Sequence, residues 1–270
     1  MPTKIQWMQR PGTVGETWNP VTGCTKVSTG CMHCYAETFA ERWRGIPGHP
    51  YEWGFDLRLW PERLDLPRRW RKPRTIFVNS MSDLFHPGVP FDFVERVWCT
   101  MAKAEQHTFQ ILTKRPGRLL EFLRQHTKAM GAYLNWHDYP TPNVWLGVSV
   151  EDQERADERI PLLLQVPAAV RFLSVEPMLG PVSLTSWWDY EYHDEVPGGA
   201  HELLDDRVVD WVVLGGESGP DARPIDLGWV RRLIEECREG ATRVFVKQLG
   251  SVWAREHGAK NRKGGEMSEW

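Results

Sequence analysis

Three cysteines lie within eleven residues near the N-terminus, and their thiolates are the groups best suited to bind a metal centre. Cys24, Cys31 and Cys34 have the spacing C-x6-C-x2-C in a loop rich in Gly and Thr. A helix is expected directly after them, from about residue 35 to 43, and its N-terminus would stabilise their negative charge. Three thiolates suit a [4Fe–4S] cluster with one open iron, whereas fully structural clusters usually take four cysteines.

A zinc site is the alternative for this loop, with His33 as the fourth ligand. His33 stands between two cysteines only three positions apart, which makes simultaneous ligation sterically awkward. The chain has five cysteines, an odd number that does not suit a secreted disulfide framework. We expect Cys99 and Cys237 to be small core residues of helices, and we expect reduced thiols in a cytoplasmic protein.

Buried-strand runs alternate with amphipathic helices after Trp60, and a further strand is expected before Cys24. Such alternation indicates parallel βαβ units. We therefore predict one α/β domain over residues 1–270, a partial βα barrel with mostly parallel strands and outer helices. An open doubly wound sheet is the structural alternative. The predicted strands are 75–80, 109–113, 144–150, 170–175, 208–214 and 243–246, and the predicted helices are 91–106, 118–129, 152–164 and 227–239.

Each of these strands ends in a cluster of polar residues. In parallel α/β folds the carboxyl ends of the strands meet on one face, and ligands bind there. We therefore expect these side chains to form one site with the cysteines. They are Asn79, Ser80, Ser82 and Asp83, then Thr113, Lys114 and Arg115, then Ser149 and Glu151, and finally Glu176, Glu217, Lys247 and Gln248.

One segment, residues 183–207, interrupts the repeating pattern. It is acidic, rich in Trp and Tyr, and broken by Gly and Pro. We predict an inserted loop, which is either a lid or binding loop over the site or a disordered surface excursion.

The overall charge gives no sign of a general affinity for nucleic acid, because the formal net charge is −3. No stretch approaches the roughly 20 apolar residues that span a bilayer, and the first ten residues lack the apolar core of a secretory signal. We expect no membrane partner. A local basic patch remains, made of Arg68, Arg69, Arg71, Lys72 and Arg74.

The loop from Trp18 to Glu37 resembles the radical S-adenosylmethionine (SAM) signature, in which an aromatic residue or His precedes the last cysteine, as His33 does here. Its first gap is x6, where that signature usually has x3. Nearly the whole chain resembles a phage- and bacteria-borne family of uncharacterised, three-cysteine, radical-SAM-like proteins, and it is distantly similar to spore photoproduct lyase, which acts on thymine in DNA. The segments that carry the resemblance are 79–85, 112–116, 174–177, 215–219 and 247–248.

The resemblance implies an enzyme whose [4Fe–4S] cluster, on Cys24, Cys31 and Cys34, binds the amino and carboxylate groups of SAM. A reductant protein of the flavodoxin or ferredoxin type supplies an electron. SAM is then cleaved to methionine and a 5′-deoxyadenosyl radical, which abstracts hydrogen from the substrate. The expected substrate is a nucleic-acid base or nucleotide, with a peptide or small metabolite as the alternative. The location is cytoplasmic, in the host if the protein is phage-encoded. Relatives often continue past residues 264–266, which implies a missing C-terminal strand or tail.

Within this mechanism, each polar strand end receives an expected role. Asp83 would bind the SAM ammonium, and Lys114 or Arg115 would bind its carboxylate, Arg being better suited to two parallel hydrogen bonds. The remaining expected SAM contacts are Asn79, Ser80, Ser82 and Thr113, with Ser149 and Glu151 at the ribose. The expected catalytic residues on the substrate side are Glu176, Glu217 and Lys247, with Gln248 beside them.

Two other functions remain compatible with these residues. The first is a non-catalytic, zinc-binding adaptor for nucleic acid, built on the cysteine loop. The second is a magnesium-dependent hydrolase or nuclease that uses Asp83, Glu176 and Glu217.

Overall fold

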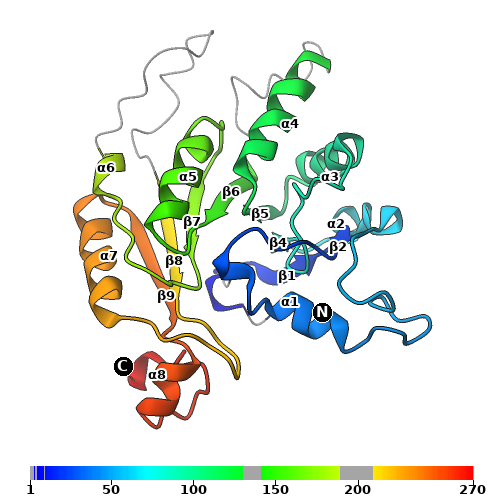
Figure 1. The fold of residues 1–270 in the computed structure, drawn as a ribbon. Helices are drawn as coiled ribbons and strands as arrows, with labels where there is room; N and C mark the ends of the chain where they lie inside the picture. The colour runs from blue at the N-terminus through cyan, green and yellow to red at the C-terminus, as the bar shows by residue number, and fades with distance from the viewer. Residues whose placement is uncertain (1–2, 4, 9, 130–140, 189–208, 270) are drawn as a thin grey trace.

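The computed structural model describes residues 3, 5–8, 10–129, 141–188 and 209–269. Its centre is a parallel sheet of seven strands in the order β1-β4-β5-β6-β7-β8-β9, curled into a half-barrel (Figure 1). The predicted inserted loop falls mostly outside the described residues. The strands are β1 (Val14–Trp18), β4 (Arg74–Val78), β5 (Thr108–Thr113), β6 (Val144–Ser149), β7 (Arg171–Val175), β8 (Trp211–Gly215) and β9 (Arg243–Gln248).

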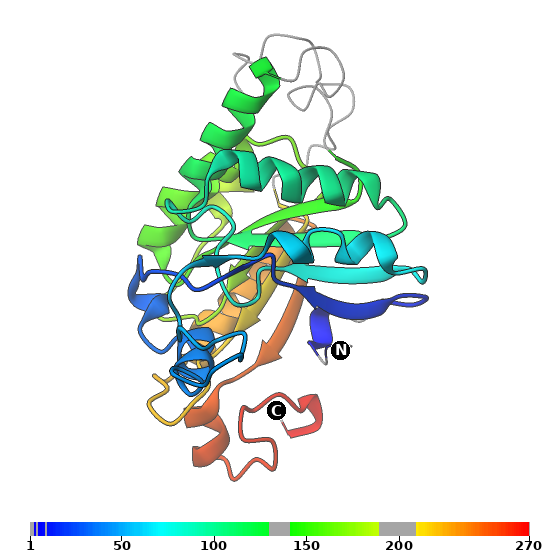
Figure 2. The same ribbon diagram turned by 90° about the vertical axis from the view of Figure 1, so that its right-hand side faces the viewer.

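Strands that are neighbours in this sheet follow one another along the chain, always in the same direction. Right-handed crossovers in a single direction place the connecting helices on one face, as Figures 1 and 2 show. This arrangement confirms a half-barrel of parallel strands and excludes the doubly wound sheet. A small antiparallel hairpin joins β2 (Val21–Thr22) to β3 (Arg58–Leu59). The helices are α1 (Tyr35–Glu41), α2 (Leu66–Arg69), α3 (Phe91–Lys103), α4 (Pro116–Ala129), α5 (Gln153–Leu164), α6 (Thr185–Trp188), α7 (Leu227–Glu239) and α8 (Ser251–Glu256).

The main core lies between these helices and the outer face of the sheet. Ile76 and Ile111 point into it from β4 and β5, and Val97 points into it from α3. Strands covered on both faces are buried along their whole length, as in β7, where all five residues are buried. Within the described ranges, no helix combines the length and the apolar character needed to cross a membrane.

The inner, concave face of the sheet is filled at one end by a short turn, Gln6–Met8. The Trp7 ring meets Phe77 of β4 edge-on with centroids 5.2 Å apart, and it meets Trp211 of β8 at 5.6 Å. These aromatic residues form a floor at the end where β8 begins. Side chains alternate between the two faces along a strand, so every second residue shares the inner face with these rings. Nearer the carboxyl ends the residues on this face are small, namely Gly147, Ser149, Ser174 and Gly215.

Candidate functional site

The polar strand ends lie along one edge of the parallel sheet, and residues 24–34, here called the cysteine loop, cross that edge. The loop starts just after β1 and β2 and leads into α1. Figure 2 shows it at the same end of the sheet as the segment that follows β8. Side chains after β5, β6 and β8 fasten the loop from separate directions.

Arg115, after β5, fastens the start of the loop. Its Nη1 lies 3.5 Å from Cys24 Sγ and donates to Asp83 at 3.0 Å, while Nη2 donates to the Thr25 carbonyl at 2.9 Å. Asp83 also accepts from the Thr113 hydroxyl at 2.8 Å, so its oxygens are occupied by donors of its own chain. Burial raises the pKa of the Cys24 thiol, because desolvation outweighs the nearby Arg115 guanidinium.

Glu151, after β6, fastens the middle of the loop and is fully buried. It accepts a hydrogen bond from the Ser28 hydroxyl and from Arg159 Nη1 at 2.8 Å, and Lys114 Nζ lies 3.5 Å away. A Cβ at Gly30 would collide with this carboxylate, so the loop approaches it as closely as glycine allows. Desolvation alone would raise the pKa of Glu151, but Lys114, Arg159 and Ser28 together hold it below its ordinary value.

Glu217, after β8, fastens the end of the loop. It lies 3.1 Å from His33 Nδ1 and accepts from Arg223 Nη2 at 2.6 Å. Arg223 also donates to the Thr29 carbonyl at 3.0 Å, so a single arginine joins the carboxylate to the loop backbone. Burial would raise the pKa of Glu217, but the hydrogen bonds from Arg223 and His33 lower it below its ordinary value.

The turn after β4 is bonded to the segment that precedes the cysteine loop. The Ser80 hydroxyl donates to Asn19 Oδ1 at 3.2 Å, and the Ser82 hydroxyl donates to the Val21 carbonyl at 2.8 Å. Asn79 has a φ of 59°, in the left-handed region that Asn tolerates better than most residues. Its buried amide nitrogen has no hydrogen-bond partner among the described residues, which leaves a donor for a bound group.

A separate charge pair joins the ends of β7 and β9. Lys247 Nζ donates to Glu176 Oε1 at 2.5 Å, and both side chains remain partly exposed. Gly215 of the intervening β8 lies directly beside Glu176, and Gln248 Nε2 donates to the Gly216 carbonyl. These groups are therefore gathered near the small residues of the inner face, where Ser149 and Ser174 are register partners.

Several residues that fasten the loop were not predicted from the sequence as functional, namely Ser28, Arg159 and Arg223. For Arg159 one signal exists, because it falls among the apolar positions of α5 and is only 1% exposed. A charge at a buried helical position calls for a partner. For Ser28 and Arg223 the sequence contains no comparable pattern.

The three cysteines of the loop are of the residue type that binds a metal centre. All five cysteines are free, and Cys24, Cys31 and Cys34 are partly exposed. Cys31 Sγ lies 3.9 Å from the Ser28 hydroxyl, while Cys24 faces Arg115. Across the described ranges, no group of three or more His, Cys, Asp or Glu side chains is gathered closely enough to hold a metal ion. The fit therefore rests on the chemistry of three free thiols in one fastened loop and on the spare Asn79 donor.

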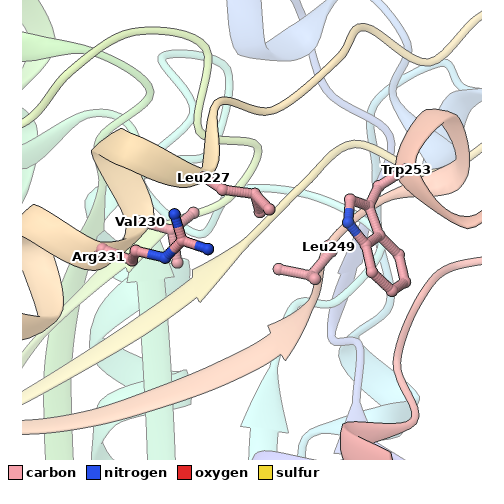
Figure 3. A pocket seen from close by; sticks show the side chains of 5 residues that line it. All are labelled: Leu227, Val230, Arg231, Leu249 and Trp253. Carbon is pink, nitrogen blue, oxygen red and sulfur yellow. The ribbon is translucent and has the colours of Figure 1, made fainter. Parts of the chain in front are cut away.

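A small hollow of about 170 Å³ lies between α7 and α8 (Figure 3). Arg231 is the one ionisable side chain among its five lining residues, and no residue of the predicted site reaches it. We therefore place the candidate site at the cysteine loop and not at this hollow. The lining residues are Leu227, Val230, Arg231, Leu249 and Trp253.

Comparison of the chain with curated proteins and with solved structures found no match. A family model described as "Protein of unknown function (DUF5131)" matches residues 2–269, almost the whole chain. The chain therefore belongs to the DUF5131 family.

Proposed function

We propose that this protein is a radical SAM enzyme in which Cys24, Cys31 and Cys34 hold a [4Fe–4S] cluster at the mouth of the half-barrel. The observation that carries the proposal is the position of three free thiols on one loop, fastened across the carboxyl ends of parallel strands. When bound, the cluster and SAM supply one-electron cleavage to a 5′-deoxyadenosyl radical that abstracts hydrogen from the substrate. The electron comes from a flavodoxin- or ferredoxin-type protein.

The side chains that fasten the loop act as positioning residues in this proposal. Asp83 orients Arg115, whose guanidinium places a positive charge beside Cys24 and offsets the negative charge of thiolate ligands. Glu151 and Glu217 fix the middle and the end of the loop. With their oxygens bonded to the protein itself, these carboxylates set the loop geometry and do not bind SAM directly.

The groups that retain hydrogen-bonding capacity at the mouth are the proposed contacts for SAM and substrate. Asn79 has a spare amide donor, Lys114 supplies an ammonium for a carboxylate, and Ser149 supplies a hydroxyl for a ribose. Glu176 and Lys247, a partly exposed pair, are the proposed groups that hold or move a proton at the substrate. We propose a nucleic-acid base or nucleotide as the substrate, in a cytoplasmic setting.

One observation favours a second candidate, a structural zinc site. His33 Nδ1 faces the Glu217 carboxylate at 3.1 Å, and zinc-bound histidines commonly donate their other ring N–H to a carboxylate. His33 Nε2 would then join the cysteines as a ligand of a non-catalytic module. A magnesium-dependent hydrolase has no such support, because Arg115 and Arg223 already neutralise Asp83 and Glu217.

Anaerobic reconstitution with iron and sulfide, followed by SAM and dithionite, separates the two candidates. The radical SAM proposal expects a brown protein with about four irons per chain and formation of 5′-deoxyadenosine. Cys24→Ser, Cys31→Ser and Cys34→Ser should each lose the iron, whereas Cys99→Ser, on α3, should keep it. One zinc per chain and a colourless protein would support the second candidate. Bound iron without SAM cleavage under several reductants would overturn the enzyme assignment.

A further inference from the structure

Residues 53–74 form a basic, tryptophan-rich segment, here called the Arg–Trp strip. The segment contains seven Arg and Lys residues against three Asp and Glu residues, although the whole chain carries a net charge of −3. It runs through β3 and α2 on the β1–β4 side of the sheet (Figure 1). This local charge is the footprint expected of a surface that contacts phosphates.

Every tryptophan of the strip has an arginine over its ring. These guanidinium groups hold the indoles in place by cation–π attraction. Trp53 nevertheless remains 52% exposed, so part of its ring is open to a further stacking partner. The pairs are Arg58 with Trp53 at 5.3 Å, Arg63 with Trp60 at 4.0 Å and Arg74 with Trp70 at 4.8 Å from the ring centroids.

Three cations of the strip are available for phosphates. Arg69, Arg71 and Lys72 are exposed, and in the part of the chain that the structure describes none of them has an ion-pair partner. By contrast, Arg68 pairs with Asp65 at 3.3 Å on the same surface. Unpaired, exposed cations beside aromatic rings are the combination used by proteins that bind single strands.

The strip is continuous with the cysteine loop. The Cys24 amide donates to the Phe55 carbonyl at 3.3 Å, and Gly23 packs so closely on the backbone of Asp56 that a Cβ there would collide with it. The β3 strand pairs with β2, which immediately precedes the cysteines. A polymer lying on the strip would therefore reach the mouth of the half-barrel.

We propose that the Arg–Trp strip binds single-stranded nucleic acid and leads it to the mouth of the half-barrel. Arg69, Arg71 and Lys72 contact phosphates, and bases stack on Trp53. A single strand is favoured over a duplex, because stacking on an indole requires an unpaired, unstacked base. The inference rests on the proposed function, since it names the substrate class of the same site.

The test is fluorescence anisotropy with the full chain purified without iron or SAM, so that binding is read independently of catalysis. The probes are labelled oligothymidylate and oligouridylate of about 20 nucleotides, long enough to cover a site of ~4–16 nucleotides. Trp53→Ala should weaken binding about tenfold. Arg71→Ala with Lys72→Ala should lower the slope of log affinity against log salt by about 1.4. The matched control is Arg231→Ala with Arg232→Ala, an exposed adjacent pair on α7, which should bind as the wild type does.

Thermal melting by circular dichroism checks that each variant is folded. Unchanged binding by both strip variants would overturn the inference, as would tighter binding of a duplex of equal length. The inference would also be overturned if polyglutamate displaced the labelled probes as effectively as unlabelled oligonucleotides do, because the strip would then bind anions in general. Preference for the DNA or the RNA probe supports the inference and identifies the natural polymer. If the wild type cleaves SAM but the strip variants bind nucleic acid as the wild type does, only the proposal for the Arg–Trp strip is refuted. If the strip variants bind more weakly but the wild type does not cleave SAM, only the proposed enzyme function is refuted.

Discussion

Ser28 donates a hydrogen bond to Glu151, and so connects the cysteine loop to a carboxylate 123 residues further along the chain. Glu151 is fully buried and is held on its other side by Arg159, itself only 1% exposed. The position of the loop is thus set by a buried ion pair at the end of β6, and not by the sequence of the loop alone.

Glu151→Gln should lower the free energy of unfolding by about 3–5 kcal/mol, because it leaves the buried Arg159 without its nearest charge partner, with only Glu158 still 4.0 Å away. Urea unfolding at neutral pH measures the effect. Glu154→Gln, which changes an exposed carboxylate of α5 that pairs with Arg155 and not with Arg159, should cost about 0.5 kcal/mol or less. An unfolding midpoint of Glu151→Gln equal to that of the wild type would show that the buried pair does not stabilise the fold.

The destabilisation by Glu151→Gln should depend on pH in a defined direction. The folded pKa of Glu151 lies below its ordinary value of 4.5, so the carboxylate stabilises the fold fully above that pH. The contribution is lost as the pH falls through the lower, folded pKa. The difference between variant and wild type should be constant between about pH 6 and pH 8 and should shrink in acid. If the difference in the free energy of unfolding between variant and wild type grows as the pH is lowered, the lowered pKa of Glu151 in the folded protein is contradicted.

Glu217→Gln should loosen the end of the cysteine loop, because His33 and Arg223 both lose a charged partner. Local opening exposes thiols before the whole protein unfolds. The apo-protein should therefore react several-fold faster with a thiol reagent at Cys31 and Cys34, as measured by mass spectrometry of the labelled peptides. Cys237, which is buried, serves as the internal reference. Glu235→Gln, an exposed change on α7, should leave the labelling rates of Cys31 and Cys34 unaltered. Equal labelling rates in the two variants would show that Glu217 does not hold the end of the cysteine loop.

Gly30→Ala should cost about 1–3 kcal/mol of stability, because the added methyl group collides with Glu151 in a well-packed site. The matched control is Gly117→Ala at the start of α4, where the nearest atom to a new Cβ would be 3.9 Å away on Leu162. Alanine there should be neutral or stabilise by about 0.5–1 kcal/mol. Thermal unfolding measures the stability of both variants. A Gly30→Ala protein as stable as the wild type would contradict the close approach of the loop to Glu151.

Glu176→Gln should have a small effect on stability, in contrast to Glu151→Gln. The Glu176–Lys247 pair is partly exposed, and such pairs contribute about 1 kcal/mol or less. A double-mutant cycle with Lys247→Met, measured by urea unfolding, gives the coupling energy. A coupling of about 3 kcal/mol or more would mark the pair as structural and not as a group poised for chemistry.

The half-barrel could be predicted from the sequence because its strands are buried on both faces. The predicted run 170–175 corresponds to β7, and the predicted helix 227–239 has the same bounds as α7. The expected strand before Cys24 is β1. The hairpin of β2 and β3 was not predicted, since two residues per strand give no periodicity.

The site could be predicted only as a set of residues at one edge of the sheet. Asp83 was expected to bind a ligand ammonium, and that role stays a prediction; its hydrogen bonds from Arg115 and Thr113 were not predicted. The partner of a carboxylate at a strand end depends on which loop crosses it, and the crossing of residues 24–34 has no signature in the pattern of apolar residues. The position of each carboxylate at a strand end could therefore be predicted, but not its hydrogen-bond partners.

The Trp7 floor has a consequence for the size and approach of any ligand. Since the indole stands between β4 and β8, its ring closes the concave side of the sheet at that end. A polymer bound at the proposed mouth therefore could not thread past Trp7 through the fold, and it would have to present a protruding unit, such as a base swung out of its chain.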